Sequence, residues 1–357
     1  MLATEKPKKR MEMTEYQSRQ LQFSGSGGEY FRIWIVNVCL SIVTLGVYSA
    51  WAKVKRNQYF YRHTTLAGAS FDYHGDPKAI LKGRIVAFLL FACYTLVGKF
   101  DQVAGSAILL VIIVAMPWLL MRSLRFRLHN TSYRGLRFAF HGSTGAAYFN
   151  FLLLPVSSAL TLGLLWPLAQ QSMARYTREN STYGSEFFKF FADSGAYYRI
   201  YFMTIFIGVL VFAGLMAGVM LLGSKELISV EAGQLVAMSV LVASIGTYLA
   251  LFLLAYPYVA ARLQNLVWNN TQLGPHGFRA QLRAREMLGI MFGNVLLTLL
   301  TLGLYKPFAD IRLARYRIEH VALLTRGSID EFVAGLQTNT SAAGEEMAEM
   351  FDFDIAL

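Results

Sequence analysis

The chain has 357 residues, of which 55% are hydrophobic and only 15% are charged. An ordinary soluble domain carries about 25% charged residues, so this composition excludes a chain that hides its apolar residues in one soluble core. The net charge of +11 could indicate nucleic acid, but in a membrane protein basic residues beside the spans fix orientation and meet anionic headgroups. We therefore expect a lipid bilayer with anionic headgroups as partner, and no nucleic acid.

Residues 1–20 are predicted to form a basic, flexible N-terminus without the apolar segment of a signal peptide. Seven apolar runs follow, several of them near the roughly 20 residues that cross a bilayer. They occupy 30–52, 85–98, 106–121, 147–170, 200–223, 235–261 and 287–309. This pattern predicts a multi-pass membrane protein that is inserted through its own helices.

The tripeptide Thr-Leu-Gly occurs three times near the end of a long apolar run, beginning at Thr44, Thr161 and Thr301. An Ala follows each Thr by eight residues and a Tyr follows it by fifteen. These residues are Ala52, Ala169 and Ala309, and Tyr59, Tyr176 and Tyr316. A framework that recurs in register predicts internal repeats of a unit that crosses or enters a membrane.

Basic residues flank each Thr-Leu-Gly run on both sides, which indicates that both ends are cytoplasmic. A helix of about 22 residues is about 33 Å long, enough to cross once but not to cross and return. We therefore favour re-entrant or in-plane segments, bent at Thr-Leu-Gly and at the following Pro167 and Pro307. Seven plain crossings are the alternative. The charge-poor links at 99–105 and 224–234 are expected to be external.

Short segments of strand and turn character follow the basic helix ends, at 63–75 and 129–142, with weaker copies at 180–187, 270–278 and 320–332. Their alternating side chains and turn glycines predict β-hairpins. Because isolated hairpins are marginal in water, we expect them to form a small cytoplasmic β layer. The predicted fold class is a polytopic α-helical membrane protein with internal repeats and this β layer.

The repeats divide the chain into repeat unit one at 21–137, unit two at 138–277 and a truncated third unit at 278–332. The remaining residues, 333–357, are rich in Ala, Gly, Glu and Asp. Such a composition favours an acidic, disordered tail.

Motifs of enzymes, cofactor sites and metal sites are missing from the sequence. His74, His141 and His276 each precede a Gly and are interpreted as equivalent repeat positions, but no acidic residue or Cys repeats with them. We therefore predict that they cap turns or meet headgroups and bind no metal. The apolar runs contain almost no ionisable residues, which argues against a proton-coupled pump. We expect no enzymatic activity and no cofactor.

The polar and glycine positions within the Thr-Leu-Gly runs are candidates for a passage or for helix packing. They are Asn37, Thr44 and Gly46, then Asn150, Thr161 and Gly163, then Asn294, Thr301 and Gly303. Such residues more often tie helices together than bind a solute. Arg134 and Arg137, with His74, His141 and His276, are candidate contacts to a partner protein or to headgroups.

The segments 30–37, 44–52 and 71–75 together resemble the YjgN-like family of bacterial inner-membrane proteins, and the resemblance extends over nearly the whole chain. It implies a multi-pass protein of the bacterial inner membrane, in a family classed as a domain of unknown function. The resemblance supplies no catalytic or binding residues.

Two functions are compatible with these sequence patterns. A solute or lipid passage could be built from the three Thr-Leu-Gly elements, because repeated, discontinuous helices are common in transporters. The alternative is a membrane scaffold that uses the β layer and the acidic tail to hold a cytoplasmic or membrane protein. One continuous polar cavity would favour the passage, and a dry, filled centre would favour the scaffold.

Overall fold

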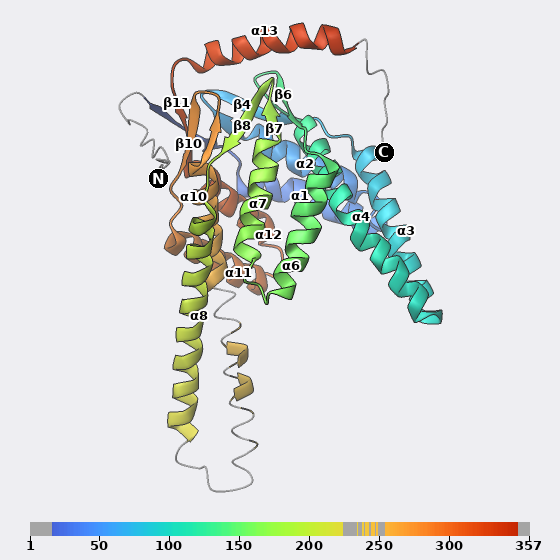
Figure 1. The fold of residues 1–357 in the computed structure, drawn as a ribbon, viewed down its shortest axis with the longest axis vertical. Coiled ribbons are helices and arrows are strands. Elements are labelled where there is room, and N and C mark those ends of the chain that lie inside the picture. The colour runs from blue at the N-terminus through green and yellow to red at the C-terminus, as the bar shows by residue number, and fades with distance from the viewer. Residues whose placement is uncertain are drawn as a thin grey trace, which may run out of the picture.

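The computed structural model has a β-sheet at one end and long helices that extend away from it (Figure 1). It describes residues 16–223, a few positions between 234 and 248, and residues 254–348. The sheet contains 11 strands in the order β1-β11-β10-β9-β8-β7-β6-β5-β4-β3-β2. The predicted layer of β-hairpins is therefore one continuous sheet.

Four β-hairpins supply eight of the strands, each with a short first strand and a longer second strand. They are β3 (Thr64–Leu66) with β4 (Ala69–Tyr73), β5 (Thr131–Tyr133) with β6 (Leu136–Phe140), β7 (Ser181–Tyr183) with β8 (Glu186–Phe190), and β9 (Thr271–Leu273) with β10 (His276–Ala280). The hairpin predicted at 320–332 does not form. Instead β11 (Val321–Thr325) pairs with β10 and with the N-terminal β1.

The N-terminal strand segment closes the sheet. β1 (Gln17–Gln20) pairs antiparallel with β11, and β2 (Gln22–Phe23) pairs antiparallel with β3. Only Leu21 separates them, and its backbone N–H donates to the Val321 carbonyl at 3.0 Å. The two edges of the sheet are thus one chain segment, so the sheet closes as a barrel does and leaves no long unpaired edge.

Five junctions around this ring use the same backbone hydrogen bond. The residue after each long strand donates its N–H to the residue before the next short strand, at 2.8–3.0 Å. The pairs are Ser24 to His63, His74 to Asn130, His141 to Asn180, Phe191 to Asn270 and Gln281 to His320. The segment 17–23 together with β11 therefore takes the place of a fifth hairpin.

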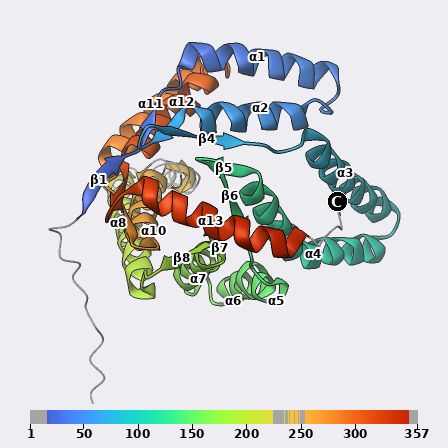
Figure 2. The same cartoon turned by 90° about the horizontal axis from the view of Figure 1, so that it is seen from above.

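Between successive strand pairs the chain leaves the sheet as one helix and returns as another. The outgoing and returning helices are α1 (Gly27–Val43) and α2 (Ser49–Arg62); α3 (Pro77–Phe100) and α4 (Gln102–His129); α5 (Thr144–Tyr148), η1 (Phe149–Leu153) and α6 (Leu154–Leu160) with α7 (Trp166–Glu179); α8 (Ser194–Gly223) and α10 (Tyr256–Asn269); and α11 (Ala284–Leu300) and α12 (Lys306–Glu319). Figure 2 shows these helix pairs arranged around the sheet.

Three described helices are long and apolar enough to cross a membrane: α3, α4 and α8 over Ser194–Gly218. The three Thr-Leu-Gly runs are instead each divided by a turn into two shorter helices. Seven plain crossings would need continuous helices there, so that alternative does not fit the structure. The run at 235–261 is described only at scattered positions before residue 254.

Apolar side chains line the inside of the closed sheet in layers. The third residues of β4, β6, β8 and β10, together with Leu21 between β1 and β2, form one layer. The four strand residues are Phe71, Phe138, Phe188 and Phe278. The third residue of each short strand contributes another, formed by Leu66, Tyr133, Tyr183, Leu273 and Leu323. Fully burying one such side chain stabilises a fold by about 1.5–3 kcal/mol, so this core holds the ring together.

Helix α13 (Ile329–Ala348) lies across the end of the sheet that faces away from α8 (Figures 1 and 2). Its Val333 and Leu336 are buried against the sheet core. The disordered tail expected from residue 333 is therefore not found over 333–348, because these apolar positions recur at helical spacing and have a surface to cover. Residues 349–357 lie outside the described part of the chain.

Candidate functional site

Each Thr-Leu-Gly sequence forms the tip of a helical hairpin. The φ angles are 50°, 54° and 50° at Leu45, Leu162 and Leu302, and 91°, 88° and 92° at the glycines that follow. Two successive residues with positive φ reverse the chain between the helices. Glycine adopts this conformation readily, whereas a left-handed Leu costs about 1–2 kcal/mol.

The Thr side chain fastens both sides of the turn. Thr44 Oγ1 donates to the Leu40 carbonyl at 2.7 Å and accepts from the Tyr48 N–H at 2.9 Å. The equivalent distances are 3.0 and 3.4 Å at Thr161 and 2.7 and 2.9 Å at Thr301. Because these hydrogen bonds stay within one hairpin, they support a packing role for the three Thr residues.

The repeated Tyr closes each hairpin at its sheet end. Its hydroxyl donates to a backbone carbonyl just before the outgoing helix, at 2.9–3.1 Å. The pairs are Tyr59 with Ser26, Tyr176 with Ser143 and Tyr316 with Arg283. Burial raises the pKa of each hydroxyl, so it stays a protonated donor at neutral pH. The constant spacing from Thr to Tyr therefore sets the distance from the hairpin tip to its closure at the sheet end.

The three asparagines are buried on the outgoing helices. Asn150 Oδ1 accepts from Ser172 Oγ at 2.6 Å, and Asn294 Nδ2 donates to the Ala309 carbonyl at 3.1 Å, so each ties its helix to the returning one. Among the described residues, the Oδ1 atoms of Asn37 and Asn294 have no hydrogen-bond partner. A buried unmet acceptor costs about 1–3 kcal/mol.

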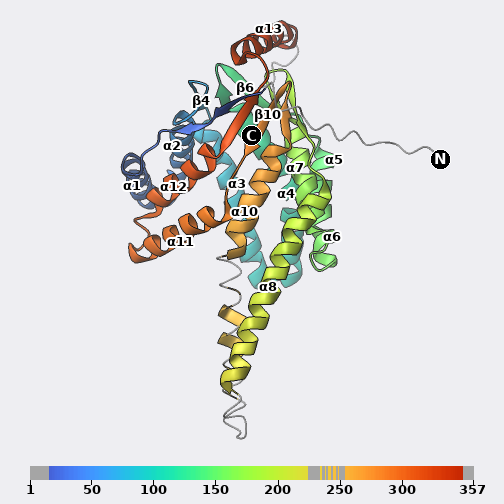
Figure 3. The ribbon, with the colours of Figure 1, turned by 90° about the vertical axis from the view of Figure 1, so that its left-hand side faces the viewer.

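The three Thr-Leu-Gly hairpins do not meet at one point. Helix α1 packs against α12, so the first and third hairpins are neighbours. In sheet order, α3 and α4 separate the second hairpin from the first, and α8 and α10 separate it from the third. Figure 3 shows α11 and α12 on one side of α8 and α6 and α7 on the other.

The hairpin tips are apolar and uncovered. Leu45, Leu162 and Leu302 are each 95% exposed. Further exposed apolar residues surround them, namely Ile42, Val43, Val47, Leu160, Leu164, Leu299, Leu300 and Leu304. Soluble proteins rarely leave such patches open to water, so these tips indicate contact with lipid or protein.

Replacing Gly163 by Val is expected to lower stability by about 1–3 kcal/mol through backbone strain. No atom lies within 4 Å of the position of an added Cβ, so the side chain of Val meets no neighbour there. Asn tolerates positive φ, and Gly163→Asn should therefore lose less than half as much. Thermal unfolding in detergent measures both, and equal losses would contradict a backbone origin.

The three histidines are not equivalent in the structure. His74 and His141 follow the ends of β4 and β6, whereas His276 opens β10. The predicted equivalence of His276 is wrong because a shared His-Gly dipeptide does not define strand register. His74 Nε2 lies 2.8 Å from Ser132 Oγ, while His276 is buried. The described residues contain no His, Cys, Asp and Glu cluster able to hold a metal ion.

Arg134 fastens α13 to the sheet. Its guanidinium pairs with Asp330 and donates to the Ala67 carbonyl at 2.8 Å, and Gln337 Nε2 donates to the Arg134 carbonyl at 3.3 Å. The side chain of Arg137 is exposed, with Nη1 3.3 Å from His129 Nε2. The two candidate contact residues therefore differ, since Arg134 is already engaged within the chain.

Arg134→Ala is expected to weaken the docking of α13 by about 1 kcal/mol, because it removes an ion pair whose acidic partner is mostly exposed. Amide hydrogen exchange should be faster over residues 329–338. Arg137→Ala is the matched control and should leave that exchange unchanged. A similar effect from both variants would show that α13 docks without the Arg134 contacts.

Residues 17–20, predicted as part of a flexible N-terminus, instead form β1, because β11 offers them a strand edge to pair with. A charged residue at the inner mouth of the sheet was not predicted either. Three residues before each short strand, four of the five positions are Tyr61, Leu128, Trp268 and Ile318, and the fifth is Arg178. An Arg at a position where the four other repeats have an apolar or aromatic residue is the sequence signal that could have identified Arg178.

Residues 18–350 match a family described as "Bacterial protein of unknown function (DUF898)". The chain is 31% identical over 137 residues to inner membrane protein YjgN of Salmonella typhimurium. The aligned region covers 38% of this chain and 35% of that protein. The chain is 30% identical over 150 residues to inner membrane protein YjgN of Escherichia coli O157:H7, where the aligned region covers 42% and 38%.

The chain thus spans less than two-fifths of the length of these relatives in the matched region. No solved structure matches. From the family match, the inner-membrane relatives and the three apolar helices, we conclude that this chain belongs to the DUF898 family and is a bacterial inner-membrane protein.

Proposed function

We propose that this chain is a non-enzymatic membrane scaffold that holds a closed β-sheet at the cytoplasmic face of the inner membrane. Helices α3, α4 and α8 span the bilayer, and the three Thr-Leu-Gly hairpins enter the lipid from the cytoplasmic side and return. The observation that carries this proposal is the exposure of the three tip leucines, each held in a costly left-handed conformation at 95% exposure.

The hairpin helices have the length for insertion into one leaflet. Helices α1 and α11 have 17 residues and α2 and α12 have 14, which corresponds to about 25 and 21 Å. These lengths are shorter than the roughly 30 Å hydrocarbon core. Lys53 and Arg312 lie about 12–15 Å along the helix from their tip leucines, at a distance that suits headgroup contact.

The hairpins differ in direction, which predicts different depths. Helices α6 and α7 run alongside α8, whereas α1 and α2 lie across it (Figures 1 and 2). On this proposal Leu162 enters the lipid deeply, and Leu45 stays near the interface.

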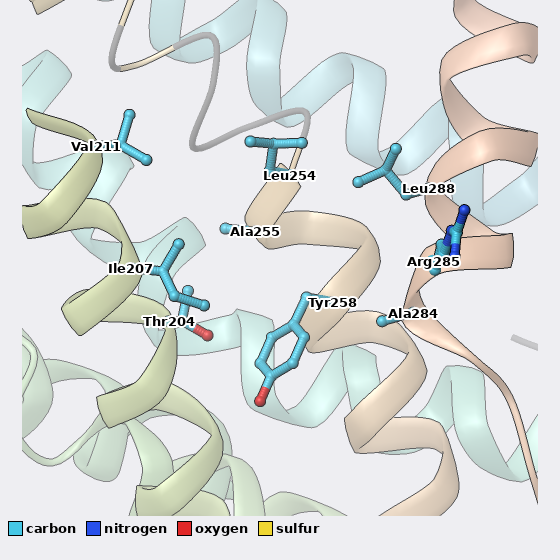
Figure 4. A pocket seen from close by; sticks show the side chains of 9 residues that line it. All are labelled: Thr204, Ile207, Val211, Leu254, Ala255, Tyr258, Ala284, Arg285 and Leu288. Atoms are coloured by element: carbon cyan, nitrogen blue, oxygen red, sulfur yellow. The ribbon is translucent and has the colours of Figure 1, made fainter. Parts of the chain in front are cut away.

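A hollow between α8, α10 and α11 also suits lipid contact (Figure 4). Its volume is about 190 Å³, and Ile207, Val211, Leu254 and Leu288 contribute to an almost wholly apolar lining. The exposed Arg285 lies at the same hollow. An acyl chain beside an anionic headgroup fits this combination.

Spin labels at residues 45, 162 and 302 test the insertion in a background that lacks Cys39 and Cys93. All three should be accessible to oxygen and protected from a water-soluble relaxation agent, with residue 162 the deepest. A label at residue 101, in the predicted external link, is the aqueous control. Tip labels as water-accessible as that control would exclude insertion.

The scaffold role needs a cytoplasmic or membrane protein partner, which the exposed Arg137 on β6 is placed to contact. Cross-linking from position 137 in cells should capture one reproducible partner, and Arg137→Ala should lose it while keeping normal thermal stability. Full complementation of a deletion strain by that variant, with no partner captured, would exclude this surface.

A passage is the second candidate, favoured by one observation. Asn37 lines a groove of about 540 Å³ beside Arg32 and Lys55, and its Oδ1 has no partner among the described residues. Asn37→Leu should then abolish complementation without loss of stability. Normal complementation together with higher stability would leave Asn37 as a packing residue only.

A further inference from the structure

The closed sheet contains a cavity of about 190 Å³ that lies away from the Thr-Leu-Gly turns. Phe71, Phe138, Phe188 and Phe278 contribute to its walls, and Phe332 of α13 lies at the covered end. The opposite end is formed by the last turns of three helices, which supply Leu128, Arg178 and Trp268. The lining includes no Asp or Glu.

Arg178 is the feature of this cavity that the fold does not explain. Its side chain is surrounded by protein, yet part of its surface stays accessible where it lines the cavity. Its guanidinium carbon lies 4.5 Å from the centre of the Trp268 ring. Within the described part of the chain, the guanidinium has no carboxylate partner and no hydrogen-bond acceptor.

The surroundings of Arg178 increase the cost of its charge. Burial and the neighbouring Arg127 lower the pKa of the Arg178 guanidinium to about 10, so it remains charged at neutral pH. A cation–π contact offsets only part of the desolvation of a buried cation. Buried charges in proteins are normally paired, and here the missing partner is an anion.

We infer that the cavity binds a small organic carboxylate, with its carboxylate on Arg178 and an apolar body about one aromatic ring in size among the phenylalanines. A guanidinium presents a planar fork of donors that matches a carboxylate. An apolar protein cavity of about 150 Å³ holds a benzene ring. The volume here therefore suits a monocyclic aromatic acid and is too small for a whole phospholipid.

A second unmet polar atom lies in the same cavity. His276 is 2% exposed, and its Nε2 has no hydrogen-bond partner among the described residues, while its Nδ1 accepts from the Arg326 N–H at 3.3 Å. Because His276 opens β10 and Arg178 ends the helix before β7, the two groups mark opposite ends of the sheet. A polar group bound at the α13 end of the cavity would meet His276.

The test uses the full chain in detergent and the fluorescence of Trp268, which lines the cavity beside Arg178. Benzoate should give a saturable change in this fluorescence. Arg178→Gln should weaken benzoate binding at least about tenfold through loss of a charge-assisted contact. Arg175→Gln, on the same helix with an exposed ion pair to Glu179, should bind like the wild type.

Further arms distinguish the cavity from nonspecific binding. Neutral benzamide should bind at least about tenfold more weakly than benzoate, and Trp268→Phe should remove the fluorescence change while calorimetry still detects benzoate. Arg178→Gln should unfold at the same or a higher temperature than the ligand-free wild type, because it removes an uncompensated charge. Benzoate should raise the unfolding temperature of the wild type alone.

The inference is independent of membrane insertion by the hairpin tips. It is overturned if benzoate shows no saturable binding to the wild type, or if Arg178→Gln binds it equally well. Inorganic sulfate binding as tightly as benzoate would also overturn it, since that result indicates an anion site without an apolar specificity pocket.

Discussion

A variant lacking residues 1–23 is expected to lose the closed sheet and to be degraded in cells. The deletion removes β1 and β2, which pair with β11 and β3 and close the ring. It also removes the half-buried Leu21 and the buried Phe23 from two apolar clusters, and the loss of Phe23 alone costs about 1.5–3 kcal/mol. Together these losses are a large share of the 5–15 kcal/mol that stabilises a typical domain.

A variant lacking only residues 1–15 is the matched control, because it keeps every paired residue of β1 and β2. It should accumulate in membranes and unfold at the temperature of the full chain. Accumulation and unfolding temperature, measured for both variants, check the prediction. Equal stability of the two would show that the sheet does not need its closing strand.

Replacing Leu45, Leu162 and Leu302 together by Asp is expected to abolish stable membrane accumulation. A charged side chain costs about 2.5–3.5 kcal/mol at the centre of a membrane helix, and the tips are fully uncovered. The single Leu162→Asp variant should have the largest effect of the three, since that hairpin runs alongside α8. Membrane fractionation and unfolding temperature in lipid nanodiscs measure the loss.

Asn at the same three positions provides the control. Asp and Asn have the same shape, and both tolerate positive φ, so the backbone of the turn is treated alike in the two variants. The Asn variant should retain most of its accumulation. If Asp and Asn behave alike, the tips are not in lipid and the insertion proposal fails.

Local sequence patterns were sufficient to predict the apolar helices, the breaks in them and the β-hairpins. Composition and run length indicated a membrane protein, and three long apolar helices are present. The recurrence of Thr-Leu-Gly indicated breaks in the apolar runs, because Gly tolerates the positive φ that a turn at Gly46, Gly163 or Gly303 requires. Alternating side chains with a turn Gly indicated the β-hairpins.

The candidate residues were predicted less well than the elements. Thr44 and its counterparts lie at the breaks as predicted, but only the tertiary structure identifies their partners as backbone groups of the same hairpin. His276 was aligned with His74 by a dipeptide, and the strand register separates them. In the sequence, Arg178 is one of several basic residues that follow an apolar run. In the structure, the ends of three helices lie together and place Arg178 at a cavity.

Sequence alone determined the membrane class, the broken apolar runs and the strand-rich links, because each depends on residues close together in the chain. Tertiary structure decided that the strands close into a ring, since Gln17 pairs with Thr325 and no local pattern encodes a contact of that separation. It also decided that α13 is a helix, because Val333 and Leu336 gain burial only when the sheet exists to be covered. The free energy that favours ring closure and the docking of α13 comes from burying apolar surfaces that only the folded chain brings together.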